Sequence, residues 1–254
     1  MALDPGVAGQ GTALVMFADS TVLAPTGTAP RSLTIALARG TRVDSGARER
    51  LCTRAQASRS RCPAASGIGF GRFAMSVGGY LEGGGQTELA WWLDAFLGTP
   101  ARRGDAASVV LQARLLGAPS VGLLLEPLIG ATVPRAARST VRVVRRADGG
   151  MGVELRFARL PVQFRPPAPV SVTPARLELS LSAVRRTRQS FVRRVRVRTP
   201  SGYEIRRIRD HRLIAHHLWR TPERCGGSWP YELRVGFPDG VRRTTGRMEC
   251  TQTP

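Results

Sequence analysis

Arginine side chains gather in one stretch of the chain, where they could bind phosphate or carboxylate groups. Alternate side chains of a β-strand point to the same face, so Arg194, Arg196 and Arg198 would stand about 6–7 Å apart in one line. Guanidinium groups bind carboxylates and phosphates through paired hydrogen bonds, and this spacing predicts an anion-binding stripe. A solvated strand face in an arginine-rich protein is the alternative. The stripe lies within three consecutive clusters, which are Arg185, Arg186 and Arg188, then Arg193, Arg194, Arg196 and Arg198, then Arg206, Arg207, Arg209 and Arg212.

The charge of the whole chain agrees with an anionic partner. Its 254 residues carry a formal net charge of +20, and all 38 basic residues are arginine. Lysine and asparagine are both absent, and because both are encoded by A-rich codons, their absence indicates a GC-rich coding sequence. This bias explains why the cations are arginine, but it does not explain their excess over Asp and Glu. The excess predicts a positive surface potential that attracts polyanions.

The histidines and glycines do not form a recognisable catalytic constellation. His211, His216 and His217 are close in sequence, but adjacent residues of a strand point to opposite faces, so His216 and His217 cannot both bind one metal ion. We expect structural or surface histidines, with a single catalytic base, an anion contact or an adventitious metal as the alternatives. The glycine-rich segment Gly67 to Arg72 lacks the lysine of a phosphate-binding loop and the spacing of a dinucleotide fingerprint.

From these residues we expect no enzymatic activity, no cofactor and no metal site. A carbohydrate-active hydrolase on a β-sandwich stays open as an alternative, because a glycosidase needs only two carboxylates at a set distance. A non-specific nucleic-acid binder is the second alternative. Specific reading of nucleic acid is not expected, because no recognition module is visible and no aromatic residues are interleaved with the arginine stripe.

The four cysteines form two local pairs, Cys52 with Cys62 and Cys225 with Cys250. Neither pair has the Cys-x-x-Cys spacing of a zinc knuckle or a redox motif. The local pairing is the most economical, so we expect two disulfides, with four buried free thiols as the alternative. Disulfides form in oxidising compartments, which predicts a protein that is secreted or associated with the cell envelope.

The sequence offers no targeting or membrane segment to accompany this location. Met1 to Phe17 has neither the basic start nor the long apolar core of a signal peptide, which leaves open whether the native N-terminus lies upstream of Met1. The best candidate for a membrane span, Val121 to Val133, is short and contains Glu126 and Pro127, so no transmembrane segment is expected.

The elements that must position these residues read as strands almost throughout. Apolar residues alternate with small or polar ones, for example at Leu33, Ile35 and Leu37, which is typical of a half-buried strand. The turn sequences Asp148-Gly149-Gly150 and Pro238-Asp239-Gly240 separate such runs and predict hairpins. Segments 87–97 and 108–116 could be helix or strand, and the surroundings favour strands. We therefore expect an all-β protein of antiparallel β-sandwich type with few or no helices.

A proline-rich segment from Pro161 to Pro174 is the best candidate for a linker. It predicts two packed or linked sandwich domains, residues 1–165 with the Cys52/Cys62 pair and residues 166–254 with the Cys225/Cys250 pair. A proline-rich crossover within one larger sandwich is the alternative.

Two motifs together resemble a known group of proteins. The first is Cys62-Pro63-Ala64-Ala65-Ser66-Gly67-Ile68-Gly69-Phe70-Gly71, and the second runs from Thr221-Pro222-Glu223-Arg224-Cys225 through Trp229 and Asp239-Gly240 to Cys250. The pattern resembles uncharacterised exported proteins of GC-rich actinobacteria. The resemblance implies secretion and a β-rich fold, and it carries no activity.

The sequence as a whole predicts an extracytoplasmic binding or structural module. Its expected partner is an anionic cell-wall or polysaccharide polymer, contacted through Arg194, Arg196 and Arg198, and its oligomeric state is left open.

Overall fold

Strands make up most of the computed structural model, which describes residues 2–4, 6–24, 28–78, 86–116, 136–156, 171–200 and 202–252. Two short α-helices and two 3-10 turns, Ser45–Ala47 and Ala64–Ser66, accompany the strands in these residues. The elements are β1 (Ala2–Asp4), β2 (Gly11–Asp19), α1 (Ser20–Leu23), β3 (Ser32–Ala36), β4 (Arg42–Val43), α2 (Arg54–Ser58), β5 (Gly67–Gly78), β6 (Gln86–Gly98), β7 (Asp105–Leu115), β8 (Ala136–Arg145), β9 (Met151–Arg156), β10 (Ser171–Leu181), β11 (Val184–Thr199), β12 (Gly202–His217), β13 (Trp219–Arg220), β14 (Ser228–Phe237) and β15 (Gly240–Glu249).

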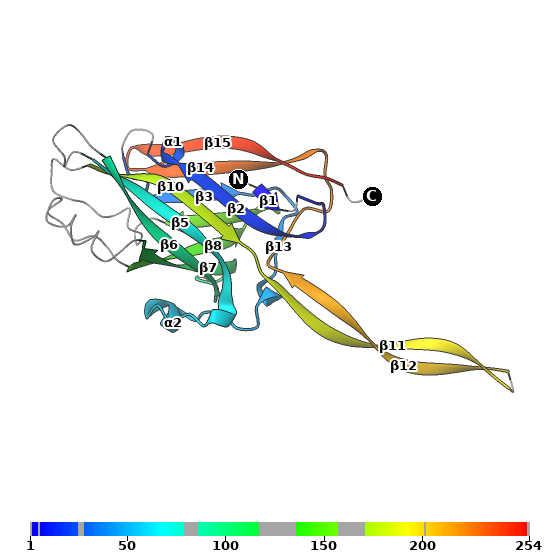
Figure 1. Cartoon of the computed structure of the whole chain (residues 1–254). Coiled ribbons are helices and arrows are strands. Elements are labelled where there is room, and N and C mark those ends of the chain that lie inside the picture. Colours follow the sequence, from blue (N-terminus) through cyan, green and yellow to red (C-terminus); the bar gives the residue numbers. More distant parts are fainter. Residues whose placement is uncertain are drawn as a thin grey trace.

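Thirteen of these strands form one antiparallel sheet, which we call the body. Twelve follow the order β15-β14-β3-β9-β8-β7-β6-β5-β10-β2-β13-β4, and β1 pairs with β2 beside this path. The segment after β15 also pairs with the segment between β1 and β2, because the backbone of Ala8 donates to Thr251 at 3.0 Å and Thr251 donates to Gly6 at 2.9 Å. The remaining strands, β11 and β12, form a separate hairpin that projects from the body (Figure 1). The expected all-β antiparallel class is confirmed.

The core follows from the alternation of side chains along the strands. Leu33, Ile35 and Leu37 are at most 3% exposed, as the alternation predicts for one buried face. In β6, Trp91 points inward and is fully buried against Phe73, with ring centroids 6.0 Å apart. The apolar side chains of the curved sheet therefore pack against one another on its inner side.

Both ambiguous segments and both expected hairpins adopt the favoured structure. Segment 87–97 lies in β6 and segment 108–116 lies in β7 up to Leu115, and the two strands pair with each other. The turn between β8 and β9 uses Gly149 at φ +79°, and β15 begins with Gly240 at φ +149°, conformations that glycine adopts without strain.

The boundary expected between residues 165 and 166 does not separate two sheets. β10 lies between β5 and β2, and β14 lies between β15 and β3, so strands from both sides of the boundary alternate in the body. Pro174 belongs to β10, where the pairing with β5 shifts register, a position at which a strand tolerates proline. The rest of the expected linker up to residue 170, and the segment 121–133, lie outside the described residues.

Both expected disulfides are present. Cys52–Cys62 closes the segment that contains α2, and Cys225–Cys250 joins the chain before β14 to the chain after β15. The described part of the chain has no free cysteine. Within the first loop, Thr53 and Gln56 form a reciprocal capping box at the start of α2. The two bridges indicate that the chain folds in an oxidising environment.

We expect the two disulfides to contribute unequally to stability, because their loops differ in length. The bridges close loops with separations of 10 and 25 residues. Chain entropy then predicts that replacing both cysteines by alanine lowers the free energy of unfolding by about 2.7 kcal/mol for Cys52–Cys62 and about 3.5 kcal/mol for Cys225–Cys250. Urea denaturation of the two double variants measures this difference. An unchanged midpoint in either variant would contradict the stabilising role of that bridge.

Candidate functional site

The predicted anion-binding stripe lies on a projecting ribbon and not on a face of the body. β11 and β12 form a hairpin of two 16-residue strands, which we call the arm, about 50 Å long. Figure 1 shows the arm extending away from the body with a clear twist. The pairing runs from Val184 opposite His217 to Thr199 opposite Gly202 without a register shift. The register therefore assigns every arm residue to one of two faces.

One face of the arm carries arginines without any acidic residue. Paired residues of an antiparallel ribbon share a face, so even-numbered residues of β11 lie with odd-numbered residues of β12. We call this the arginine face, and its arginines are Arg186, Arg188, Arg194, Arg196, Arg198, Arg207 and Arg209. All of them are exposed. The opposite face, which we call the mixed face, carries Arg185, Arg193, Arg206 and Arg212 together with Glu204 and Asp210.

The structure therefore places the three predicted residues together and adds others to them. Arg207 lies directly opposite Arg194, and Arg209 lies opposite Val192. Sequence reasoning recognised these arginines as a cluster but did not assign them to the same face. The turn sequence Thr199-Pro200-Ser201-Gly202 could have placed them there. Interpreted as the turn of a hairpin, it fixes which residues of the two strands lie opposite each other.

The two faces differ in how their charges are compensated. On the mixed face, Arg193 pairs with Asp210 at 3.2 Å and Arg206 with Glu204 at 3.1 Å. Arg212 donates to Gln189 at 3.0 Å, and Arg185 lies 4.0 Å from Glu49 of the body. Within the described residues, no arginine of the arginine face takes part in an ion pair.

The arginine face is therefore electrostatically unfavourable without a partner. Like charges directly across a strand pair destabilise it, as Arg194 and Arg207 must do here. Only Arg196 has an aromatic contact on this face, 4.1 Å above the ring of Tyr203. Exposed apolar side chains stand between the arginines, among them Ile205 and Leu213, which are 69% and 71% exposed. An anion bound here would offset the repulsion.

His216 connects the arm to the body. Its Nδ1 lies 3.0 Å from an oxygen of Asp44, and its Nε2 lies 3.0 Å from the hydroxyl of Thr187. The second oxygen of Asp44 accepts from the backbone of Gly46 at 2.8 Å. The order Thr187, His216 and Asp44 resembles the hydroxyl nucleophile, base and carboxylate of a catalytic triad. None of these three residues lines the pocket described below. We interpret the chain of contacts as the fixed base of the arm.

The other two histidines do not join this contact. His211 lies exposed on the arginine face opposite Ser190. His217 packs so closely on Gly11 of β2 that a Cβ at Gly11 would lie 1.9 Å from its ring. The described residues contain no group of three His, Cys, Asp or Glu side chains that could hold a metal ion.

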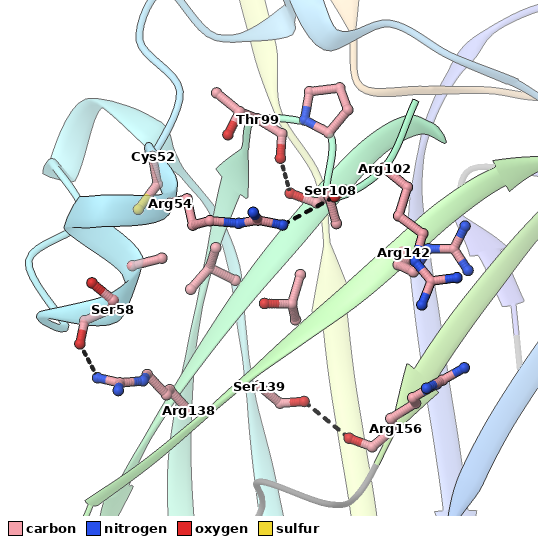
Figure 2. Close-up of a pocket in the computed structure, with 15 residues that line it drawn as sticks. Cys52, Arg54, Ser58, Thr99, Arg102, Ser108, Arg138, Ser139, Arg142 and Arg156 are labelled. Atoms are coloured by element: carbon pink, nitrogen blue, oxygen red, sulfur yellow. Dashed lines mark hydrogen bonds between the residues drawn. The ribbon is translucent and has the colours of Figure 1, made fainter. Parts of the chain in front are cut away.

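A second arginine-rich site, which the sequence did not suggest, lies on the outer face of β7, β8 and β9. It is a pocket of about 520 Å³ between these strands, α2 and the turn from Thr99 to Arg102 (Figure 2). The register aligns Ser108, Arg142 and Glu154 in one row across the three strands. Five arginines line the pocket, and they come from separate parts of the sequence: Arg54, Arg102, Arg138, Arg142 and Arg156.

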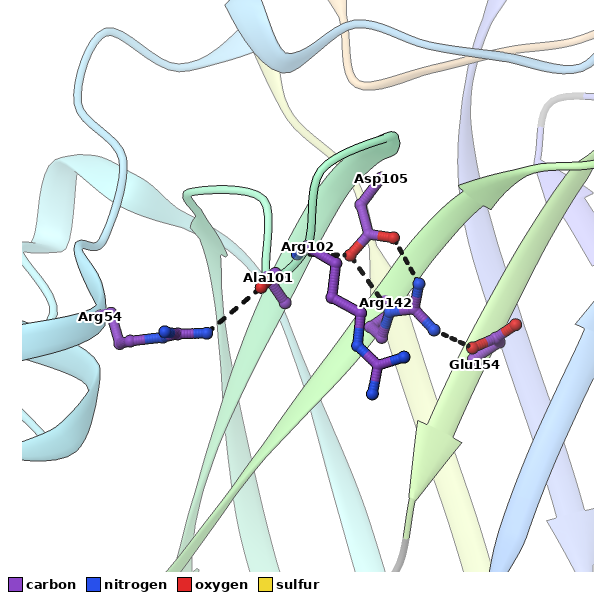
Figure 3. Close-up of polar contacts among 6 residues, drawn as sticks. All are labelled: Arg54, Ala101, Arg102, Asp105, Arg142 and Glu154. Carbon is purple, nitrogen blue, oxygen red and sulfur yellow. Dashed lines mark hydrogen bonds and ion pairs between the residues drawn. The ribbon is translucent and has the colours of Figure 1, made fainter.

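Arg142 is held in place by two carboxylates (Figure 3). Its Nε and Nη2 donate to Asp105 at 3.1 and 2.6 Å, and its Nη1 donates to Glu154 at 2.7 Å. The side chain of Asp105 is only 2% exposed. The hydrogen bond from Arg142 lowers the pKa of Asp105 and raises the pKa of Arg142.

A β-bulge makes this contact possible. Asp105 and Ala107 have the same parity, and the alternation of β7 alone would point Asp105 into the core beside Ala107. The register shifts by one residue between them, so Asp105 pairs with Val144 and turns to the outer face that carries Arg142.

Comparison with known proteins finds no relative of this chain. No family model matches the chain, and neither does any curated protein or any solved structure. Across the described ranges, no helix has the length and apolar character needed to cross a membrane.

The Asp105–Arg142 contact makes stability depend on pH in a predictable direction. Because the folded pKa of Asp105 is lowered, its contribution is present above the unfolded value of about 3.9 and is lost as the pH falls through the folded pKa. Asp105→Asn should lower the free energy of unfolding by about 2 kcal/mol at pH 7, and the difference should shrink below about pH 4.

Urea denaturation at pH 7 and at acid pH measures this effect. Asp239→Asn provides the control, because Asp239 is exposed in the turn between β14 and β15. A difference for Asp105→Asn that stays constant across the pH range would contradict the assigned role of the carboxylate.

Proposed function

We propose that this chain is an extracytoplasmic module that binds an anionic polymer of the cell envelope through the arginine face of the arm. The observation that carries the proposal is a set of seven exposed arginines on one face of a projecting ribbon, with no acidic residue on that face. A repeating carboxylate or phosphate polymer supplies the missing charges. Since the arm projects from the body, such a polymer can reach it without displacing other elements (Figure 1).

The spacing of the arginines suits a linear partner. Side chains two residues apart on one strand stand about 6–7 Å apart, so a single chain of charges can meet several guanidinium groups in succession. Each contact between exposed charges contributes little alone, typically under about 1 kcal/mol. Linked contacts along one polymer act together, and the apparent affinity then exceeds that of any single contact.

The compartment and the aromatic residues favour an envelope polymer over nucleic acid. Two disulfides support an oxidising environment outside the cytosol, where wall polymers and polysaccharides are the abundant polyanions. Binding of single-stranded nucleic acid commonly uses several aromatic platforms for stacking. On the arginine face Tyr203 is the only Phe, Tyr or Trp residue, and Arg196 already covers its ring.

The hydrolase considered from the sequence receives less support. Asp105 and Glu154 are the carboxylates bonded beside the pocket, and both are bonded to Arg142. A retaining or inverting glycosidase needs one carboxyl group that can donate a proton, and the lowered pKa of Asp105 opposes this role.

The proposal predicts that the two faces of the arm differ in their contribution to polymer binding. Arg194→Gln, Arg196→Gln and Arg198→Gln together remove three charges from the arginine face. Arg193→Gln, Arg206→Gln and Arg212→Gln together remove three from the mixed face and serve as the charge-matched control. We expect the first triple variant to bind immobilised polygalacturonate or a polyglycerol phosphate with a weaker salt dependence. The negative slope of log affinity against log salt should become smaller in magnitude by about two to three. The control should keep a slope close to that of the unchanged protein.

Several outcomes would overturn the proposal. Equal losses in both triple variants would show attraction by net charge alone, and unchanged retention of both would remove the arm from the contact. Tighter retention on duplex DNA than on either envelope polymer, lost in the first variant only, would assign the arm to nucleic acid instead. Circular dichroism of each variant verifies that the arm and body remain folded.

A further inference from the structure

The pocket beside α2 brings uncompensated arginines together at a second place in the molecule. Figure 2 shows the side chains of Arg102, Arg142 and Arg156 on the same side of the pocket, from the turn before β7, from β8 and from β9. Arg102 and Arg156 take part in no ion pair with the described residues. Five arginines line the pocket, and the two carboxylates bonded there both hold Arg142. The positive charges therefore outnumber the negative ones around the pocket.

Arg142 is oriented before any ligand arrives. A guanidinium group has five N–H donors, and Asp105 and Glu154 occupy three of those on Arg142. The remaining donors belong to Nη1 and Nη2, and the carboxylates hold them in a fixed plane. Arg102 lies beside Arg142 in both close-up views (Figures 2 and 3), so the two guanidinium groups can meet one anion together. Fixed donors lose little entropy when a ligand binds.

The rest of the lining suits hydroxyl groups. Ser108 donates its hydroxyl hydrogen to the carbonyl of Thr99 at 2.6 Å, and Ser139 donates to the carbonyl of Arg156 at 3.0 Å. Both serines are buried, Ser108 at 2% and Ser139 at 5% exposed, and Ser139 has the parity of the core residue Val141. The exposed hydroxyl of the pocket is therefore that of Thr140, with the Ser108 oxygen on the same outer face. Val110 and Ala57 supply a small apolar surface between the polar groups. The volume of about 520 Å³ lies within the usual range for small-molecule sites.

From this arrangement we infer that the pocket binds a single sugar unit that carries a phosphate or a carboxylate group. The anion meets Arg102, Arg142 and Arg156, and the sugar hydroxyls meet Thr140 and Ser108 on the outer face. Arg54 lies on the opposite wall, where it donates to the carbonyl of Ala101 at 3.2 Å and holds α2 against the turn before β7. The site goes beyond the proposed function, because none of its residues belongs to the arm.

Titration calorimetry of the whole protein with three small probes tests this inference. Glucose 1-phosphate represents the phosphate, glucuronate represents the carboxylate, and glucose is the neutral reference. The test variant is Arg102→Gln with Arg156→Gln, because neither residue is needed for an ion pair in the described structure. The control is Arg103→Gln with Arg145→Gln, which removes the same charge from exposed neighbouring positions that do not line the pocket.

We expect at least one charged sugar to bind saturably with one site per chain, while glucose does not bind. The test variant should bind at least about tenfold more weakly, since it loses charge-assisted hydrogen bonds, and the control should stay within about twofold. The charged sugar that binds more tightly identifies the anion as phosphate or carboxylate. Binding should persist in the variant with Arg194, Arg196 and Arg198 replaced by glutamine, which separates this site from the arm.

The inference fails if neither charged sugar saturates the protein. It also fails if glucose binds as tightly as the charged sugars, or if the test variant and the control lose affinity equally. Loss of binding in the arm variant would mean that the sugars bind to the arginine face and not to the pocket. Polymer retention by the arm is measured separately with the two triple variants.

Discussion

In an antiparallel pair, the register between two strands decides which side chains share a face, and the features of this chain that could bind a ligand depend on that constraint. In the body it turns Val141 and Val153 into the core and leaves Arg142 and Glu154 together outside. In the arm, an unbroken register of paired residues gathers arginines on one face and places both acidic residues on the other. The same backbone pattern therefore creates the apolar core, the pocket and the arginine face.

Electrostatic compensation distinguishes structural arginines from those that need a partner. Arg142 is bonded to Asp105 and Glu154, and Arg193 and Arg206 form ion pairs on the mixed face. Carboxylates of the chain itself therefore neutralise these three charges. The arginine face has no such partners among the described residues, and its charges repel one another across the ribbon. The folded protein tolerates this because solvent screens the exposed arm and because His216 fixes its base to Asp44. Self-repulsion retained on a projecting element is the main physical argument for an anionic partner.

The sequence predicts local features well because they depend on neighbouring residues. Alternation identified the buried faces of the strands and the common face of Arg194, Arg196 and Arg198, and short separations identified both disulfides. Features that depend on distant pairing were not predicted. The pocket joins arginines from residue 54 to residue 156, the bulge before Ala107 reverses the side of Asp105, and the membership of Arg207 in the arginine face needs the register of the arm. The proline-rich segment suggested two domains, but β10 and β14 pair with strands from the first half of the chain.

The proposed function requires that a polyanion contacts one face of the arm and not the other. The most direct measurement follows the Nε–H resonances of individual arginine side chains by nuclear magnetic resonance while polygalacturonate is added to the intact protein. Contact through the arginine face should give saturable shifts at Arg194, Arg196, Arg198, Arg207 and Arg209, with Arg193 and Arg206 nearly unchanged. Shifts spread equally over both faces, or confined to arginines of the body, would contradict it.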